Sequence, residues 1–532
     1  MRLSLVLVSF VSPILLAACG SDSSSSSPGG AEIGAGAAAN EIPIAERPAG
    51  SDMRLASDLT ISEIVAFQTV KAPLFKAGVD DVRKIPLIEG KEALIRVMVK
   101  PSTKDFAVRD VRCVLHLEKA DGTVLPNMTA HAAVRRASIE SILTSSLNFT
   151  LPADVVTEGL KLSAELIDEE GTEVAALAAS AARYPSDGLP VDASVISMGH
   201  GIKLVIVPVR YEADSSGRLP VVSNEQIEIY RKTMLALYPI SDVTITVREA
   251  YGSQQTVKAD GTGWSALLND VIKLRQGDRV EDDEYYWGVF APSKSFNDYC
   301  NRGCVAGLSG LLDESDTSMR ASIGIGYGGQ EAAETMAHEI GHAHGRDHAP
   351  CVTAGARITG VDKNFPYSDG SIGVYGWNRA EGVLVDPNQF SDMMGYCTPN
   401  WISDYTYLKL VNRIVDVNEV SAASIWGEPK SAKSSASSAA AKQSFRMVSV
   451  DGEGAMSFSG NITSRPLKSG SLVDVTRELV SGASVVTKAR FIKYDHVPGG
   501  ILMVQEDAAS PAVKLTVTNL VKAGTRQIRL DR

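Results

Sequence analysis

One eleven-residue stretch constrains this chain more than any other feature. Residues 338–348 read HEIGHAHGRDH, which places His338, His342 and His348 at the spacing HExxHxxGxxH. On an α-helix, positions i and i+4 lie on the same face, so His338 and His342 can present their imidazoles to one ion. The stretch therefore predicts a helix that carries two ligands of a metal site.

The residues around this pair have predicted roles of their own. Glu339 would lie next to the metal but off the ligand face, where a carboxylate can take a proton from a metal-bound water. Gly345 can adopt the left-handed backbone that ends a helix, and the resulting turn would bring His348 to the ion as the third ligand. The fourth position stays open for water, as catalytic zinc requires. His344 would point away from the metal, as a surface or supporting residue.

This pattern resembles the metzincin clan of zinc endopeptidases, whose other mark is a methionine-containing turn beneath the metal. Residues 391–397, SDMMGYC, are similar to that turn, with Met394 in the methionine position and Met393 as the alternative. The resemblance implies that Tyr396 lies near the zinc, either as an extra ligand or as a hydroxyl donor to the oxyanion. It also implies an α+β metzincin-like catalytic domain, a mixed sheet with an active-site helix.

A strand is predicted immediately before the zinc helix. Residues 321–329 alternate small and apolar side chains and end in a Gly-Gly break. The resemblance implies that this strand is the sheet edge that pairs with an extended peptide substrate. An ordinary inner strand is the alternative that the sequence leaves open.

Sequence patterns divide the rest of the chain into further regions. Short alternating strands parted by turn signals predict an Ig-like β-sandwich at 59–190, followed by the zinc protease domain at 196–426. A Lys/Ser/Ala-rich linker is predicted at 427–443, and strand patterns return in a C-terminal β-domain at 444–532. We expect both β-domains to be spacers or lids, with carbohydrate or protein adhesion as the alternative.

The start of the chain predicts its compartment. An apolar run at 3–16 is too short to span a bilayer and is followed by Leu-Ala-Ala-Cys19, which resembles a bacterial lipoprotein signal. The resemblance implies cleavage of residues 1–18 and lipidation of Cys19. A Ser/Gly/Ala-rich stalk at 19–58 would then tether the protein to the cell envelope, at the outer membrane or cell surface, or precede its release. An ordinary signal peptide with a stray cysteine is the alternative.

The other cysteines agree with an exported protein. Cys351 comes three residues after the last predicted ligand and Cys397 directly follows Tyr396, so a bridge between them would join the two loops beneath the metal. A thiol metal site is the weaker alternative, because the chain has no CxxC pair. The predicted states are two bridges and one buried thiol: Cys351–Cys397, Cys300–Cys304 and Cys113.

These observations predict a zinc-dependent endopeptidase with one catalytic Zn²⁺. Glu339 would activate a zinc-bound water for the hydrolysis of peptide bonds in extracellular protein substrates. A net charge of -11 argues against nucleic acid as a partner. Membrane contact would come from the lipid anchor alone. The alternatives are a cell-surface adhesin or binding scaffold with a residual protease fold, and a mucin- or glycoprotein-directed protease.

Overall fold

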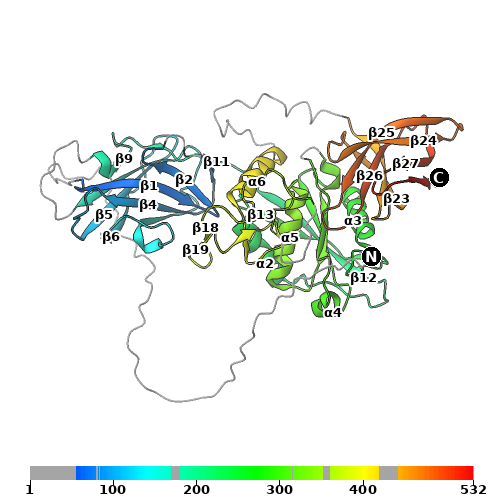
Figure 1. The fold of residues 1–532 in the computed structure, drawn as a ribbon, viewed down its shortest axis with the longest axis horizontal. Coiled ribbons are helices and arrows are strands. Elements are labelled where there is room, and N and C mark those ends of the chain that lie inside the picture. The colour runs from blue at the N-terminus through cyan, green and yellow to red at the C-terminus, as the bar shows by residue number, and fades with distance from the viewer. Residues whose placement is uncertain are drawn as a thin grey trace, which may run out of the picture.

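The computed structural model of the chain describes residues 55–79, 82, 84–168, 180–313, 316–351, 360–418 and 441–530. These residues form an N-terminal, a central and a C-terminal region that follow one another along the long axis of the molecule (Figure 1). The predicted signal, Cys19, nearly all of the stalk and most of the predicted linker lie outside the described residues.

The N-terminal region consists of two antiparallel sheets with the strand orders β2-β1-β4-β7 and β10-β8-β5-β6. Their alternating apolar side chains form a shared core, in which Cys113 is buried as a free thiol. A short parallel pair, β3 with β11, adjoins them. The strands are β1 (Leu59–Phe67), β2 (Lys71–Lys76), β3 (Leu87–Ile88), β4 (Ala93–Pro101), β5 (Arg109–Glu118), β6 (Met128–Val134), β7 (Leu147–Leu151), β8 (Lys161–Asp168), β9 (Arg183–Tyr184), β10 (Val191–Asp192) and β11 (Val195–Ile196).

The central region is built on a sheet of order β13-β12-β15-β17-β16, with β14 paired to β12. All of its pairings are parallel except that of β16 with β17. Strand β12 is a nearly continuous apolar run because both faces of the sheet are covered. The strands are β12 (Ile202–Tyr211), β13 (Val243–Val247), β14 (Tyr251–Ser253), β15 (Glu284–Phe290), β16 (Gly307–Ser309) and β17 (Ala321–Ile325).

Helices cover this sheet on both faces. On one face, Leu204 and Ile206 of β12 share a core with helices α2 and α5. On the other face, Val205 and Val207 share a core with α3 and with the C-terminal region. The helices are α2 (Asn224–Leu237), α3 (Trp264–Asp278), α4 (Phe296–Cys300), α5 (Gly329–Ala343) and α6 (Asp404–Val417). Short pairs complete the region: β18 (Gly376–Asn378) with β19 (Val383–Val385), and β20 (Ser391–Asp392) with β21 (Asn400–Trp401).

The strand before the zinc motif is not the sheet edge that was predicted. Strand β17 lies between β15 and β16, with Ala321 opposite Tyr286 on one side and Ile323 opposite Leu308 on the other. The edge strand is β16, which has only three residues. Such a short segment has no readable alternation, so the sequence could not identify it.

The C-terminal region is one antiparallel sheet of order β23-β22-β26-β25-β24-β27-β28. One of its faces packs on α3 of the central region through a shared core that includes Met447, Ile492 and Ile501. Strands β25 and β26 are joined by residues 494–499, which we call the hairpin tip. The strands are β22 (Gln443–Val450), β23 (Met456–Ser464), β24 (Ser471–Leu479), β25 (Ser484–Lys493), β26 (Gly500–Gln505), β27 (Ala512–Thr518) and β28 (Thr525–Arg529).

The α+β class predicted from the zinc motif is wrong. Strands make up 39% of the described residues and helices only 17%, so the chain is mainly β. The prediction gave most weight to one helical motif, whereas most strands come from the two flanking regions. None of the helices among the described residues is long and apolar enough to cross a membrane.

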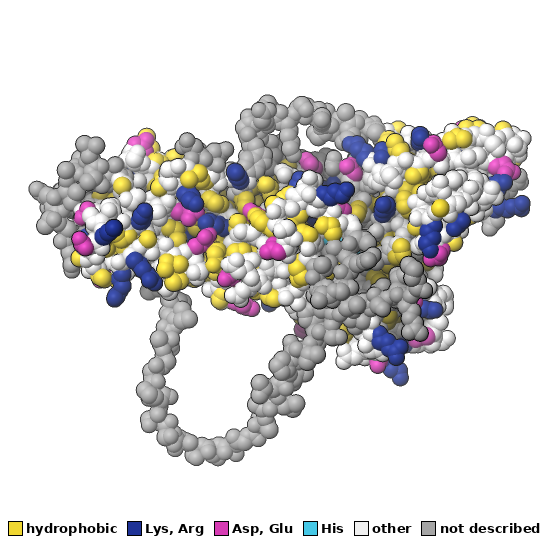
Figure 2. Space-filling model, viewed as in Figure 1, with side chains coloured by type: hydrophobic (Ala, Val, Ile, Leu, Met, Phe, Trp, Pro, Cys, Tyr) yellow, Lys and Arg dark blue, Asp and Glu magenta, His cyan; other side chains and the backbone are white. Residues whose placement is uncertain are grey.

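The surface carries charges of both signs. On the face shown in Figure 2, acidic and basic side chains are interspersed over the three regions, and this face presents no continuous basic area. Several apolar side chains are exposed between them, which is ordinary for a folded protein.

Candidate metal centre

Helix α5 carries the first two histidines of the motif and ends where the sequence predicted. Gly345 has a φ of 78°, in the left-handed region that glycine adopts without strain. Its N–H donates to the carbonyl of His342, and the N–H of Arg346 donates to the carbonyl of Gly341. The chain then reverses and brings His348 back towards the helix.

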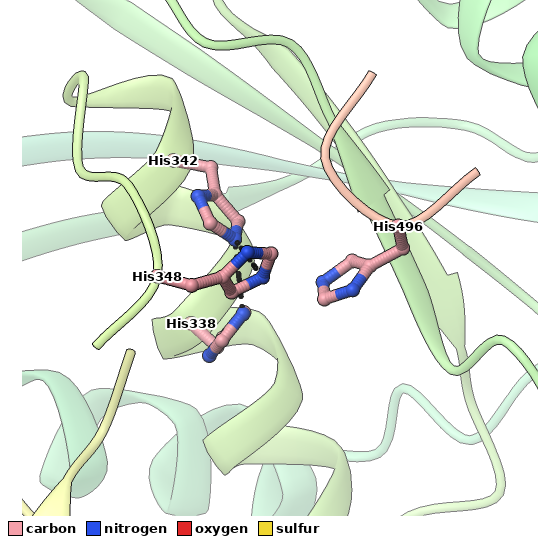
Figure 3. Close-up of side chains that lie close together, drawn as sticks. All are labelled: His338, His342, His348 and His496. Atoms are coloured by element: carbon pink, nitrogen blue, oxygen red, sulfur yellow. Dashed lines mark hydrogen bonds between the residues drawn. The ribbon is translucent and has the colours of Figure 1, made fainter. Parts of the chain in front are cut away.

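The three motif histidines converge through their Nε2 atoms (Figure 3). The Nε2 of His342 lies 3.0 Å from that of His338 and 3.2 Å from that of His348. Ligand nitrogens about 2.0–2.1 Å from a tetrahedral zinc ion are separated by about 3.3 Å, so this triangle fits such an ion.

Backbone carbonyls orient two of these rings. The Nδ1 of His338 donates to the carbonyl of Met393 at 2.7 Å, and the Nδ1 of His342 donates to that of Arg346 at 2.5 Å. This tautomer leaves Nε2 without a proton and free to coordinate a metal. Burial, with a further contribution from the nearby His496, lowers the pKa of His338 to about 3, so the imidazole is neutral.

Met394 lies directly beneath the metal-site helix. A Cβ at Gly341 would lie 2.6 Å from the Met394 sulfur, so the glycine makes room for the methionine. Met393 contributes its carbonyl to His338 instead. The turn is held by the buried carboxylate of Asp392, which accepts the N–H groups of Met394 and Ser403. Of the two candidate methionines, Met394 therefore has the position beneath the helix.

Both predicted disulfides are present. Cys351 is bonded to Cys397, and Cys300 is bonded to Cys304. The backbone N–H of Tyr396 donates to the carbonyl of Cys351, which adds a hydrogen bond to the same junction. The Cys351–Cys397 bridge thus ties the loop after the third histidine to the methionine turn.

Glu339 is buried beside the histidines, with 1% of its surface exposed. Burial raises the pKa of its carboxyl well above the usual value, and the neighbouring Asp495 adds to the rise. Strand β16 crosses so close to this carboxyl that a Cβ at Gly307 would lie 2.2 Å from its Oε1. Only glycine at position 307 leaves the space that Glu339 occupies.

A fourth histidine, which the sequence did not predict, enters the site from the C-terminal region. His496 lies in the hairpin tip, and Figure 3 shows its ring facing the other three. Its Nε2 is 2.9 Å from Oε1 of Glu339, and its Nδ1 is 2.6 Å from the hydroxyl of Tyr396. Burial by itself would lower the pKa of His496, but the carboxylates of Asp495 and Glu339 raise it to about 9.

Tyr396 and Asp495 complete the cluster. The Tyr396 hydroxyl is 3.2 Å from Nε2 of His348, and burial raises the pKa of this phenol. A carboxylate oxygen of Asp495 lies 3.5 Å from Nε2 of His342. Two overlapping groups of possible ligands result, each with its ligand atoms within 4.8 Å of one another: His338, His342, His348 and His496, and Glu339, His342, Asp495 and His496. This His/Glu/Asp cluster could hold a metal ion.

His344 is not at the surface. Its ring is 1% exposed and stacks on Tyr285 with 4.3 Å between ring centroids. Its Nδ1 donates to the carbonyl of Ile340. The side chain points away from the metal ligands, as the helix geometry predicted, but into the core that joins α5 to the sheet.

Comparisons with known proteins do not identify the chain. No protein-family model and no curated protein matches it. Among solved structures, a calcium-binding mutant of Bacteroides uniformis β-glucuronidase 2 aligns with 10% identity and a TM-score of 0.14, covering 46% of this chain and 25% of that one. The β-glucuronidase of Parabacteroides merdae aligns with 9% identity and a TM-score of 0.14, covering 46% of this chain and 30% of that one. This chain thus spans about a quarter to a third of their length, and such scores carry no inference about fold or function.

Proposed function

We propose that this protein is a zinc-dependent endopeptidase of the metzincin type. The observation that carries the proposal is the convergence of three Nε2 atoms, 3.0 and 3.2 Å apart, next to the buried carboxyl of Glu339. Three imidazoles and a neighbouring carboxyl group are the set that hydrolytic zinc sites use. The spacing HExxHxxGxxH and the position of Met394 beneath α5 support the same class.

The residues of the site divide the chemistry between them. Zinc, when bound, would supply a Lewis acid that polarises the peptide carbonyl and acidifies water. Glu339 accepts a proton from the attacking water at its carboxylate and later delivers it to the leaving amine. Burial and the neighbouring Asp495 raise the pKa of its carboxyl, which favours its acceptance of a proton. Tyr396 offers its hydroxyl to the developing negative charge on the carbonyl oxygen.

The first test combines metal content with peptide cleavage. The soluble form that starts near Glu41 should bind about one zinc per chain, and His342→Ala should lower that content. Glu339→Gln keeps the size of the side chain but removes the base, so it should bind zinc and lose cleavage of casein by about a hundredfold or more. A protein that keeps full cleavage in excess 1,10-phenanthroline would refute the assignment.

We also propose attachment to the bacterial cell envelope through a lipid on Cys19. The support is the Leu-Ala-Ala-Cys sequence after a short apolar run. Metabolic labelling with a palmitate analogue should mark the wild-type protein and not Cys19→Ser, and the labelled protein should fractionate with membranes. Equal labelling of the two proteins would show that Cys19 is not the lipidated residue.

A further inference from the structure

The hairpin tip of the C-terminal region lies along the edge strand of the central sheet. Tyr494 forms an antiparallel bridge with Gly310, directly after β16. The backbone N–H of Ser309 donates to both carboxylate oxygens of Asp495, at 3.2 Å each. An edge strand offers unpaired backbone groups to any extended segment, and here the tip contacts Ser309 and Gly310 at the end of β16.

The next residue of the tip engages the two groups that would act on a substrate. The imidazole of His496 contacts Glu339 through Nε2 at 2.9 Å and Tyr396 through Nδ1 at 2.6 Å. A peptide carbonyl under attack would need to reach these same two side chains. Glu339, His342 and His348 are each exposed by 1% or less, so these groups are covered in this arrangement.

We propose that the hairpin tip occupies the peptide-binding position of the central region and thereby holds the protein latent. The inference rests on the proposed endopeptidase function and adds its regulation. The tip resembles a bound peptide in two respects, because its backbone pairs beside β16 and its His496 side chain covers the proposed base. The peptide that opens the site by competition would therefore be an extended segment that pairs antiparallel to β16.

The packing of the C-terminal region keeps the tip in this position. Ile492 and Tyr494, at the end of β25 and the start of the tip, belong to a core that also includes Leu308 and Leu312 of the central region. Beyond His496, the side chain of Val497 lies against Gly261, where an added Cβ would come within 2.7 Å of it. The tip is thus anchored on both sides of His496, so opening requires the loss of contacts on both sides.

The test compares substitutions in the tip with a neighbouring control. His496→Ala removes the contacts with Glu339 and Tyr396, and Asp495→Ala with His496→Ala removes the contact with Ser309 as well. Lys493→Ala is the matched control, because Lys493 is exposed on the same hairpin one residue before the tip. If the alanine variants melt at a lower temperature than the wild type, His496→Gln is used in their place, because glutamine preserves the size and polarity of the side chain. All proteins are the full soluble form that starts near Glu41.

Two measurements are made on each protein. Casein cleavage by the alanine variants should be at least about tenfold faster than by the wild type, because latency requires the open form to be a minor population. Release of bound zinc to a chromogenic chelator should accelerate by a similar factor, because opening the tip exposes the ligands. The same acceleration is expected when the tip substitutions are combined with Glu339→Ala. Lys493→Ala should match the wild type in both assays.

The outcomes separate the two proposals. Slower cleavage by His496→Ala with unchanged zinc release would overturn latency and make His496 a participant in the reaction. Cleavage by the wild type as fast as by the variants would also overturn latency and leave the endopeptidase proposal intact. Faster zinc release without cleavage by any of the proteins would refute the endopeptidase function, and latency with it.

Discussion

The two flanking β-regions attach to the central region in different ways. The N-terminal region shares an apolar core with α2, α5 and α6 and makes hydrogen bonds outside the metal centre, such as those that the carbonyl of Thr69 accepts from Trp377 and Trp401. The C-terminal region shares an apolar core with α3 and places Asp495 and His496 among the possible metal ligands. Among the described residues, the possible metal ligands come from the central and C-terminal regions alone.

This difference shows that two domains of similar strand content can have unequal effects on one site. A hairpin is two strands and a tip, and the tip can carry polar residues that the strands do not need for their own packing. Here the strands β25 and β26 complete a core, and their tip reaches the metal centre. We therefore expect changes at the C-terminal interface to alter activity and changes at the N-terminal interface to alter stability alone.

The largest effect is expected at Asp316, which holds the C-terminal region to the centre. Its fully buried carboxylate accepts the N–H groups of Lys468 and Ser469 at 2.9 and 2.7 Å. Asp316→Ala removes the acceptor of both donors and leaves the buried N–H of Ser469 unpaired, which should lower the free energy of unfolding by about 3 kcal/mol. Loosening this contact should also raise casein cleavage severalfold. Urea unfolding and initial cleavage rates measure the two effects.

Asp282 provides the control at the same interface. Its side chain is 36% exposed and pairs with Arg465 at 3.0 Å. Exposed ion pairs contribute about 0–1 kcal/mol, so Asp282→Ala should change neither stability nor cleavage appreciably. If Asp316→Ala is destabilised by the expected amount but cleaves casein no faster, the C-terminal region does not control access to the site.

Most residues of the metal centre could be predicted from the sequence, but little of the structure around them could. The positions of His338, His342 and His348 follow from helix periodicity and a glycine turn, which are local properties. The mainly β class was missed because the zinc motif describes one domain, whereas the strand patterns predicted on both sides of it contribute most of the strands. His496 was missed because it lies 148 residues after His348, in a tip of the sequence YDHVPG that reads as an ordinary turn. Only the tertiary contact of the β25–β26 hairpin with β16 brings it to the site.

A smaller effect, confined to stability, is expected at Lys91 in the N-terminal interface. Its ammonium donates to the hydroxyl of Thr69 and to the carbonyls of Leu235 and Tyr238, at 2.8–2.9 Å. Burial, with a further contribution from Arg379, lowers the pKa of Lys91 from 10.5 to about 7. Between these values the unfolded chain binds one more proton than the folded chain, so this group makes stability rise with pH.

Lys91→Met should abolish that dependence. From about pH 7 upwards, the free energy of unfolding of the wild type should rise relative to that of the variant by about 1.4 kcal/mol per pH unit. Urea unfolding of both proteins at several pH values gives this difference. The contributions of ionisable groups that the two proteins share cancel. Casein cleavage at neutral pH should be equal in the two proteins. A change in cleavage would contradict the separation of the two interfaces.

The smallest effect is expected at Trp401, which lies between the N-terminal region and the loop after the methionine turn. Its indole N–H donates to the carbonyl of Thr69 at 3.0 Å, and that carbonyl also accepts the backbone N–H of Trp377. Trp401→Phe should cost about 1 kcal/mol, because Thr69 keeps one donor. Trp377→Phe is the matched control, since its hydrogen bond comes from the main chain and survives the substitution. Both variants should cleave casein at the wild-type rate. Slower cleavage by Trp401→Phe alone would show that the N-terminal region also supports the metal centre, through the methionine turn that Trp401 follows.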